Sequence, residues 1–201
     1  MDHEAIRKLA LVEDAEALSA LAEAATARDE LLRRTAVETI SRHPQGRELG
    51  AVILAALRDP SEYVVRTACD VVAQWELHEA HELVTALLAN PSVATRQTAV
   101  RALGSIWIDA DFVPIFRIYT GAREVEIQRE AAWVLRRRAN ASQWRQLFDA
   151  FHVDELARHR QWACELAARF SGSDVLPALK ALSLDVDGHV RKAAVEAIEA
   201  V

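Results

Sequence analysis

The sequence is poor in the residues that break helices, form disulfides or build sheets. Its 201 residues include 6 Gly, 5 Pro, 2 Cys and 1 Met, and aromatic residues make up 6%. Such a composition, rich in Ala, Leu, Glu and Arg, argues against a disordered chain or an all-β fold and favours helices. No apolar run approaches the roughly 20 residues of a membrane helix, and the acidic start MDHEAIRK differs from a signal peptide. We therefore expect a soluble, cytoplasmic, helical protein without a cofactor.

Lysine is also scarce, with three residues, and the net charge of the chain is −6. Residues 112–170 are the exception, with 10 Arg against 7 Asp and Glu, a local charge of +3. A nonspecific nucleic-acid binder normally carries a clear basic excess. Any basic surface is therefore local, and a nucleic-acid partner is disfavoured.

The sequence does contain an internal repeat. Six segments superpose, each with an alanine at the same place and a spacing of 31 or 32 residues: Ala36, Ala68, Ala99, Ala131, Ala163 and Ala194. Apolar residues one, three and four places after each alanine predict a helix with one buried stripe, the B helix of each repeat. A second apolar series predicts an A helix before each B helix: Leu21, Ile53, Val84, Phe116, Phe148 and Leu179.

These helix pairs predict a single domain over residues 1–201. The expected repeats are 12–43, 45–75, 77–107, 110–139, 141–170 and 172–201, after a half repeat at 2–11 that Asp2 caps. The expected fold class is all-α, a right-handed α-solenoid of thirteen helices with the B helices lining a concave face. The last helix is apolar without a polar cap, so either the native chain continues beyond Val201 or this end pairs with another copy. We favour a monomer over a homodimer.

The joints between A and B helices share a turn residue, and in three repeats an arginine follows six places later. The pairs are Asn90 with Arg96, Asp154 with Arg160, and Asp185 with Arg191, and Asp59 occupies the same turn place. Together with the period, this pattern resembles HEAT repeats, specifically the short HEAT-like repeats of the phycobilin-lyase type. The resemblance implies an architecture and no particular activity.

The turn residue is replaced in two repeats, and so is the arginine. Ala27 and Ala122 stand at the Asp place, while Val65 and Gln128 stand at the Arg place. We expect looser inner turns in those repeats.

The exposed face of the B helices carries a basic and an acidic column. Arg34–Glu38, Arg66–Asp70 and Lys192–Glu196 are predicted i,i+4 pairs, each contributing about 0.2–0.5 kcal/mol. Repeats three to five break this ladder of charge pairs, and Arg101 and Trp133 stand where the other copies carry an acid. Three arginines, Arg136, Arg137 and Arg138, then follow Trp133.

A tryptophan among arginines is typical of interface hot spots. We therefore expect a noncatalytic scaffold or adaptor that binds another protein or peptide in the concave groove. The predicted partner-binding residues are Trp133, Trp162, Arg101, Arg129, Arg136, Arg137, Asp70 and Glu165. The arginines would bind acidic groups, and Asp70 and Glu165 basic ones. The competing interpretation is that Trp133 only packs against Arg129 or Arg137.

Other chemistry has weaker signals. In LHEAHEL, His78, His81 and Glu82 are candidate zinc or iron ligands, but the motif is not H-E-x-x-H, and a solvated helix start is favoured over a metal site. Cys69 and Cys164 are expected to be buried and unpaired. No nucleophile with its base is evident, so we do not expect an enzyme. Two alternatives stay open: a DNA-binding protein or DNA glycosylase with HEAT-like repeats, and an accessory factor or lyase of the phycobilin-lyase type.

Overall fold

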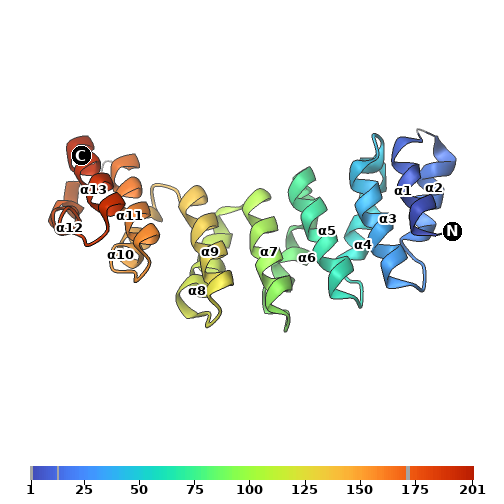
Figure 1. Cartoon of the computed structure of the whole chain (residues 1–201), viewed down its shortest axis with the longest axis horizontal. Helices are drawn as coiled ribbons and strands as arrows, with labels where there is room; N and C mark the ends of the chain where they lie inside the picture. Colours follow the sequence, from blue (N-terminus) through green and yellow to red (C-terminus); the bar gives the residue numbers. More distant parts are fainter. Residues whose placement is uncertain (1, 13, 171–172) are drawn as a thin grey trace. The chain divides into compact units, whose positions relative to one another are not determined.

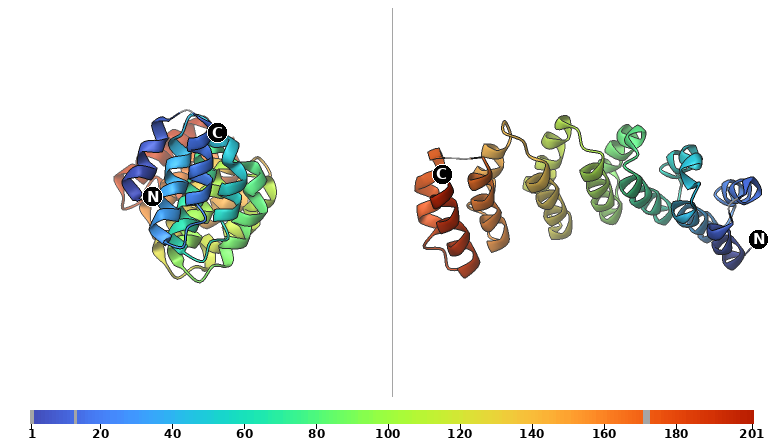
Figure 2. Two further views of the ribbon diagram at one scale, coloured as in Figure 1. Left: turned by 90° about the vertical axis from the view of Figure 1, so that its right-hand side faces the viewer. Right: turned by 90° about the horizontal axis from the view of Figure 1, so that it is seen from above.

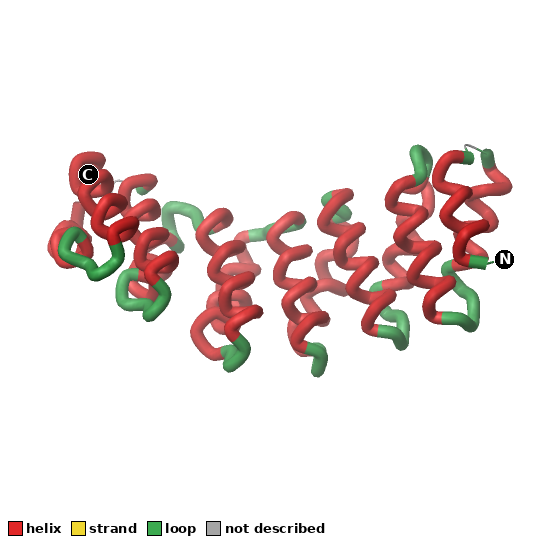
Figure 3. The backbone as a smooth tube through the Cα atoms, viewed as in Figure 1, coloured by secondary structure: helices red, strands yellow, loops and turns green. Residues whose placement is uncertain are grey.

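The fold is all-α, as the repeat pattern predicts. A computed structural model describes residues 2–12, 14–170 and 173–201, and this part of the chain contains thirteen α-helices and no strand (Figures 1 and 3). The orphan helix is α1 (His3–Lys8). The A helices are α2 (Ala15–Ala24), α4 (Gly50–Ala56), α6 (His81–Ala86), α8 (Phe112–Gly121), α10 (Trp144–Phe151) and α12 (Leu176–Leu182). The B helices are α3 (Glu30–Arg42), α5 (Glu62–Trp75), α7 (Val93–Ser105), α9 (Val125–Arg138), α11 (Ala157–Arg169) and α13 (Gly188–Ala200).

The chain divides into two compact units, residues 1–108 and 109–201. In the first unit α3 packs against α1 and α5, and α5 packs against α7 (Figure 1). In the second unit α11 packs against α9 and α13. Each A helix packs on the B helix of its own pair, and Figure 2 shows these pairs from two further directions. A single pair cannot cover its own apolar face, so each repeat depends on its neighbours within the unit.

The six repeated alanines lie on the buried faces of the B helices. All six have no exposed surface. A small residue at this place lets helix axes approach to about 8–10 Å. The predicted A-helix series is also buried at Leu21, Ile53, Val84, Phe148 and Leu179. Phe116 is only half-buried, because Ile115 and Tyr119 turn toward the core in α8.

The predicted half repeat forms as α1. The Asp2 side chain accepts a hydrogen bond from the Ala5 N–H at 2.8 Å, which confirms it as the N-cap. One turn later Ile6 is completely buried. α1 therefore covers the exposed side of α3 at the start of the first unit.

The turn residues stand two places before the N-cap of the following B helix, and their side chains accept backbone hydrogen bonds. Asp59, Asp154 and Asp185 each accept a hydrogen bond from the N–H two residues ahead, at 2.8 Å. This is an Asx turn, which lets a side chain replace a backbone turn acceptor. The side chains that cap α5 and α13 are Ser61 and Asp187.

The repeated arginine closes its own turn through backbone carbonyls. Arg160 Nη1 donates to the carbonyl oxygens of Asp154 and Glu155 at 2.8 and 2.9 Å. Arg33, Arg96 and Arg191 make the same two bonds to the residues six and five places before them.

The expectation of looser turns is therefore wrong for the first and fourth repeats. Arg33 reaches the Ala27 carbonyl at 3.0 Å, and Gln128 reaches the Ala122 carbonyl at 2.7 Å. The acceptor is the backbone, so the turn does not need an aspartate at that place.

Two of these arginines also link neighbouring repeats. Arg33 binds Asp59 through Nε and Nη2 at 2.7 and 2.8 Å, and Arg160 binds Asp185 in the same way. All four side chains are at most 15% exposed. A two-pronged pair of this kind fixes one repeat against the next in a single geometry.

The surface ion pairs only partly follow the prediction. Lys192 and Glu196 pair at 3.7 Å, as expected. Within the described residues, Glu38 pairs with Arg42 at 2.6 Å instead of Arg34, and Asp70 pairs with Arg101 instead of Arg66. A glutamate four places before its basic partner is the favoured order on a helix, which Glu38 and Arg42 satisfy.

Both cysteines are free and buried, as predicted. Burial raises the pKa of the Cys69 and Cys164 thiols to about 12 in each case. A thiol that stays protonated at neutral pH is a poor nucleophile, so both serve as small core residues.

We predict that Asp185→Asn lowers the free energy of unfolding by about 2–3 kcal/mol, because it leaves the nearly buried Arg160 without its charged partner. Glu196→Gln, which breaks an exposed pair, should change it by less than about 0.5 kcal/mol. Urea unfolding followed by circular dichroism measures both. Equal effects would contradict a structural role for the buried pair.

The same pair predicts an acid dependence. The hydrogen bonds from Arg160 hold the pKa of Asp185 below its ordinary value of 3.8. A lowered carboxyl pKa stabilises the fold above the ordinary value, and this contribution is lost as pH falls through the folded value. The stability difference between the unchanged protein and Asp185→Asn should therefore be full at pH 7 and shrink below about pH 4, as measured by urea unfolding across pH.

Candidate functional site

An exposed row of three side chains runs along α9 in the second unit. Arg129, Trp133 and Arg137 are four places apart and so share one face of the helix. The Trp133 side chain is 38% exposed, and the guanidinium carbon of Arg137 lies 4.5 Å from the centre of its ring. Arg129 makes no ion pair or hydrogen bond with any residue the structure describes. We call these three residues the Trp133 row.

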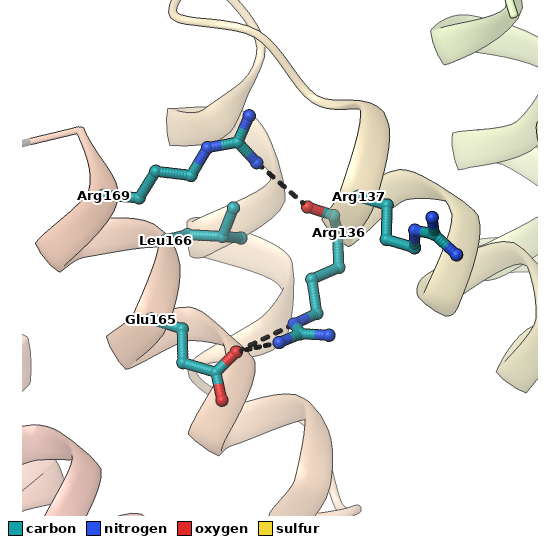
Figure 4. Close-up of a pocket in the computed structure, with 5 residues that line it drawn as sticks. All are labelled: Arg136, Arg137, Glu165, Leu166 and Arg169. Carbon is teal, nitrogen blue, oxygen red and sulfur yellow. Dashed lines mark hydrogen bonds and ion pairs between the residues drawn. The ribbon is translucent and has the colours of Figure 1, made fainter.

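A hollow of about 360 Å³ lies beside this row, between α9 and α11. Its lining residues are Arg136, Arg137, Glu165, Leu166 and Arg169 (Figure 4). Leu166 is almost fully buried, while three arginines and one glutamate supply the charge. We call this the arginine hollow, and its formal charge is positive.

Arg136 and Glu165 bind each other across the arginine hollow. Nε and Nη2 of Arg136 lie 2.8 and 2.5 Å from Oε2 of Glu165 (Figure 4). Gln161 Nε2 donates to Oε1 of the same carboxylate at 3.1 Å. From the sequence, Arg136 was predicted to bind an acidic group of the partner and Glu165 a basic one. The structure instead neutralises one with the other, so both arrange the wall of the hollow rather than offering free charges.

Arg137 is different, because its side chain points away from Glu165 in Figure 4. Its stacking on Trp133 covers one face of the indole and keeps the guanidinium at the surface. Arginine in this position can stack on a ring and still bind a carboxylate with two hydrogen bonds. The uncompensated positive charge of the site therefore lies with Arg129 and Arg137.

Trp162 is not a surface residue, contrary to the prediction that it flanks Trp133 at the partner site. It is 7% exposed, and its ring stacks with His159 at 5.2 Å between centres. The guanidinium groups of Arg136 and Arg158 lie over it at 5.2 and 5.8 Å. Trp162 stands one place before the repeated alanine Ala163, and this position faces the core. The buried ring packs against the Arg136 guanidinium.

Asp70 and Arg101 belong to the first unit and form an exposed pair. Their closest atoms are 4.0 Å apart, and the side chains are 61% and 48% exposed. An exposed pair at this separation contributes little stability. The structure brings these two predicted residues together as partners of each other, and their role toward another protein stays a prediction.

The candidate metal ligands do not form a coordination site. Among the described residues no group of three His, Cys, Asp or Glu side chains can hold a metal ion. His78 and Glu82 are exposed at the start of α6, and His81 is half-buried. The described part of the chain also has no helix long and apolar enough to cross a membrane.

Arg169 is a site residue that the sequence reasoning missed. It lines the arginine hollow, and its Nη1 approaches the Arg136 carbonyl at 3.5 Å, near the end of α9. Arg169 stands six places after Ala163, just as Arg137 stands six places after Ala131. This shared place in the repeat is the signal in the sequence that relates Arg169 to Arg137.

The comparisons with known proteins agree with this architecture. A family model described as HEAT repeats matches residues 50–119. No curated protein matches the sequence.

Solved structures of helical-repeat proteins are similar to the whole length of the chain. A designed armadillo repeat protein in complex with the peptide (KR)4 is 21% identical, with a TM-score of 0.61 over 100% of this chain and 99% of that one. The Escherichia coli protein YibA is 16% identical, with a TM-score of 0.70 over 96% and 74%. The phycocyanin lyase complex of CpcE and CpcF from Nostoc is 18% identical, with a TM-score of 0.57 over 98% and 87%. At these identities the likeness establishes the helical-repeat fold alone.

We predict that Trp133 and Trp162 differ in what they do for the stability of the fold. Trp162→Ala should lower the free energy of unfolding by about 3–5 kcal/mol, because it empties a buried aromatic site. Trp133→Ala should cost about 1 kcal/mol or less, because that ring is exposed and mainly contacts Arg137. Urea unfolding of the two variants measures the difference. Similar losses would make Trp133 a packing residue, which is the competing interpretation.

Proposed function

We propose that this chain is a noncatalytic protein-binding scaffold and that it binds an acidic segment of a partner protein on α9. The observation that carries the proposal is the Trp133 row. An exposed indole stands there between two exposed arginines that have no acidic partner in the described chain.

The chemistry of the row matches that of interface hot spots. Tryptophan and arginine dominate such sites, because they bury a large rigid surface and form directional hydrogen bonds at once. Arg137 already holds one face of the indole, so little side-chain freedom is lost when a partner covers the other. This preorganisation favours binding.

The arginine hollow supplies the second element of the proposed site. Arg137 belongs to both the row and the hollow, which connects the indole to a depression with Arg169 on its far side. A partner residue seated on Trp133 would therefore place a neighbouring carboxylate near Arg137. The Arg136–Glu165 pair holds the wall between them in place.

The fold comparison supports binding of an extended segment. The designed armadillo relative binds the peptide (KR)4, and the present chain has the same kind of helical-repeat fold. The charge of the proposed segment is opposite, because the Trp133 row is basic. We propose that the segment lies along the B helices of the second unit, across α9 and α11.

DNA binding and bilin chemistry are the alternatives to protein binding. The net charge of −6 and the acidic residues on the B helices disfavour a phosphate backbone. The phycocyanin lyase likeness concerns the fold alone.

We predict that Trp133→Ala and Arg137→Glu each weaken partner binding by about thirtyfold, the effect of losing one hot spot. The bait is the whole chain, and the partner is identified by mass spectrometry after affinity capture from the native lysate. Its affinity for each variant is then measured by titration calorimetry.

Tyr63→Ala is the matched control, because Tyr63 is a 49% exposed ring on α5 with Arg66 at 6.0 Å from its centre. Binding should survive this change. Equal losses for Tyr63→Ala and Trp133→Ala, or no loss for either, would reject the Trp133 row as the site. Retardation of DNA in a low-salt gel shift, abolished by Arg137→Glu, would favour the nucleic-acid alternative.

A further inference from the structure

A second hollow opens on another edge of the second unit. It has a volume of about 600 Å³ and lies at the ends of four helices: the C-terminal turns of α8 and α10 and the N-terminal turns of α9 and α11. None of the residues of the Trp133 row or the arginine hollow lines it. We call it the turn hollow.

Asp154 lies in the wall of the turn hollow and receives several hydrogen bonds. The Tyr119 hydroxyl donates to Oδ2, and the Leu156 N–H donates to Oδ1 at 2.8 Å. Burial opposes ionisation of this carboxyl, but the hydrogen bonds from Tyr119 and Leu156 and the close His159 ring hold its pKa below the ordinary value. Burial, together with the hydrogen bond to Asp154, raises the pKa of Tyr119, so the phenol stays a donor. Asp154 therefore carries a full negative charge at neutral pH.

That carboxylate makes no ion pair with a Lys or Arg of the described chain, although the Arg160 guanidinium, which binds the Asp154 carbonyl, is near enough to interact with its charge. The Asp154 side chain is still 19% exposed. Its close neighbour is the His159 ring, whose Nδ1 lies 3.0 Å from Oδ2 of Asp154. That nitrogen is poorly aligned for a hydrogen bond, so it stays buried without a hydrogen-bond partner within the described chain.

His159 is held rigidly behind the carboxylate. Its side chain is 3% exposed, and its ring stacks between Phe151 and Trp162 at 5.3 and 5.2 Å. A buried polar atom that lacks a partner in a folded protein needs an explanation. The ring nitrogen faces Asp154, so a ligand with several N–H donors would bind the acceptor positions of the carboxylate that remain open to the hollow.

The mouth of the turn hollow is apolar. Val125 is 43% exposed and Val153 is 70% exposed, and Leu156 is half-buried beside them. Glu155 is exposed at the same mouth and makes no side-chain hydrogen bond or ion pair with the described residues. Apolar side chains and carboxylates therefore line the same hollow. This combination fits a side chain with an aliphatic stem and a cationic head.

Exposure of an apolar turn residue does not by itself mark this site. Leu184 occupies the same repeat place as Val153 and is 82% exposed, yet it lines neither of the two hollows. The aromatic, carboxylate and imidazole groups stand together only beside Val153 among the residues that line these hollows. An anion is excluded by the charge of Asp154 and Glu155, and a metal ion by the lack of three ligands in the described chain.

We propose that the turn hollow binds a lysine or arginine side chain of a partner protein. The stem lies between Val125 and Val153, and the head binds Asp154 and Glu155. This site is separate from the Trp133 row and takes the opposite charge. The chain would then hold two points of a partner, one acidic and one basic.

The probes are N-acetyl-lysine amide and N-acetyl-arginine amide, titrated into the whole chain and followed by the methyl resonances of Val125 and Val153. The neutral and acidic comparison probes are N-acetyl-norleucine amide and N-acetyl-glutamate amide at equal ionic strength. The basic probes should give saturable shifts with an affinity at least threefold above that of norleucine. Equal shifts for norleucine, stronger shifts for glutamate, or no saturable shift with any probe would overturn the proposal.

Three exposed positions make variants that leave the core unchanged. Glu155→Gln should weaken the basic probes about threefold by removing a charge at the mouth, and Val153→Ser should weaken all probes that carry an aliphatic stem. Leu184→Ser is the matched control and should leave the titration unchanged. Trp133→Ala should also leave it unchanged, which separates this test from that of the proposed function. Equal weakening by Val153→Ser and Leu184→Ser would place the binding elsewhere and reject the turn hollow.

Discussion

Close packing of the B helices at one buried alanine per repeat is the constraint on which the rest of the structure depends. All six alanines have no exposed surface, and no larger side chain would let neighbouring axes come as close. Within each unit, this fixes the angle at which successive B helices present their outer columns. Trp133 and Arg137 are exposed because they stand two and six places after Ala131, outside the buried stripe. The location of the candidate site is thus a consequence of the packing register.

The turns add a second constraint, which links each repeat to the next. Arg33 and Arg160 bind two carbonyls of their own turn and, with a two-pronged contact, the aspartate of the following turn. Gln128 keeps the carbonyl bond in the fourth repeat but has no guanidinium to reach further. In the fifth repeat Asp154 is consequently bound by Tyr119 and lies beside His159, where Asp59 and Asp185 each have an arginine. The turn hollow stands where the arginine link between repeats is missing.

The two proposed sites in the second unit therefore follow from departures from one pattern. At the Trp133 row an indole replaces an acid, which leaves the flanking arginines without partners on their own helix. At the turn hollow a glutamine replaces an arginine, so Asp154 lacks the two-pronged arginine contact that Asp59 and Asp185 have. Elsewhere the repeat neutralises its own charges, as Arg136 does with Glu165 and Arg101 with Asp70. Functional sites are expected where local consistency fails, because a regular position already has its partners within the chain.

The sequence by itself determined the helices, their order and the buried face of each, because a 31-residue period and a 3.6-residue turn leave one consistent register. It also placed Asp2 as a cap, the two cysteines in the core and Trp133 at the surface. Only the tertiary structure decided which charges pair, since Arg136 meets Glu165 29 residues away across a helix interface that spacing along one helix does not describe. It also decided that Trp162 is buried. The position next to Ala163 can face the core or the solvent, and α9 and α10 pack against α11 so that Trp162 is covered. Contacts between repeats depend on side-chain length and rotamer, so they were fixed only when neighbouring helices came together.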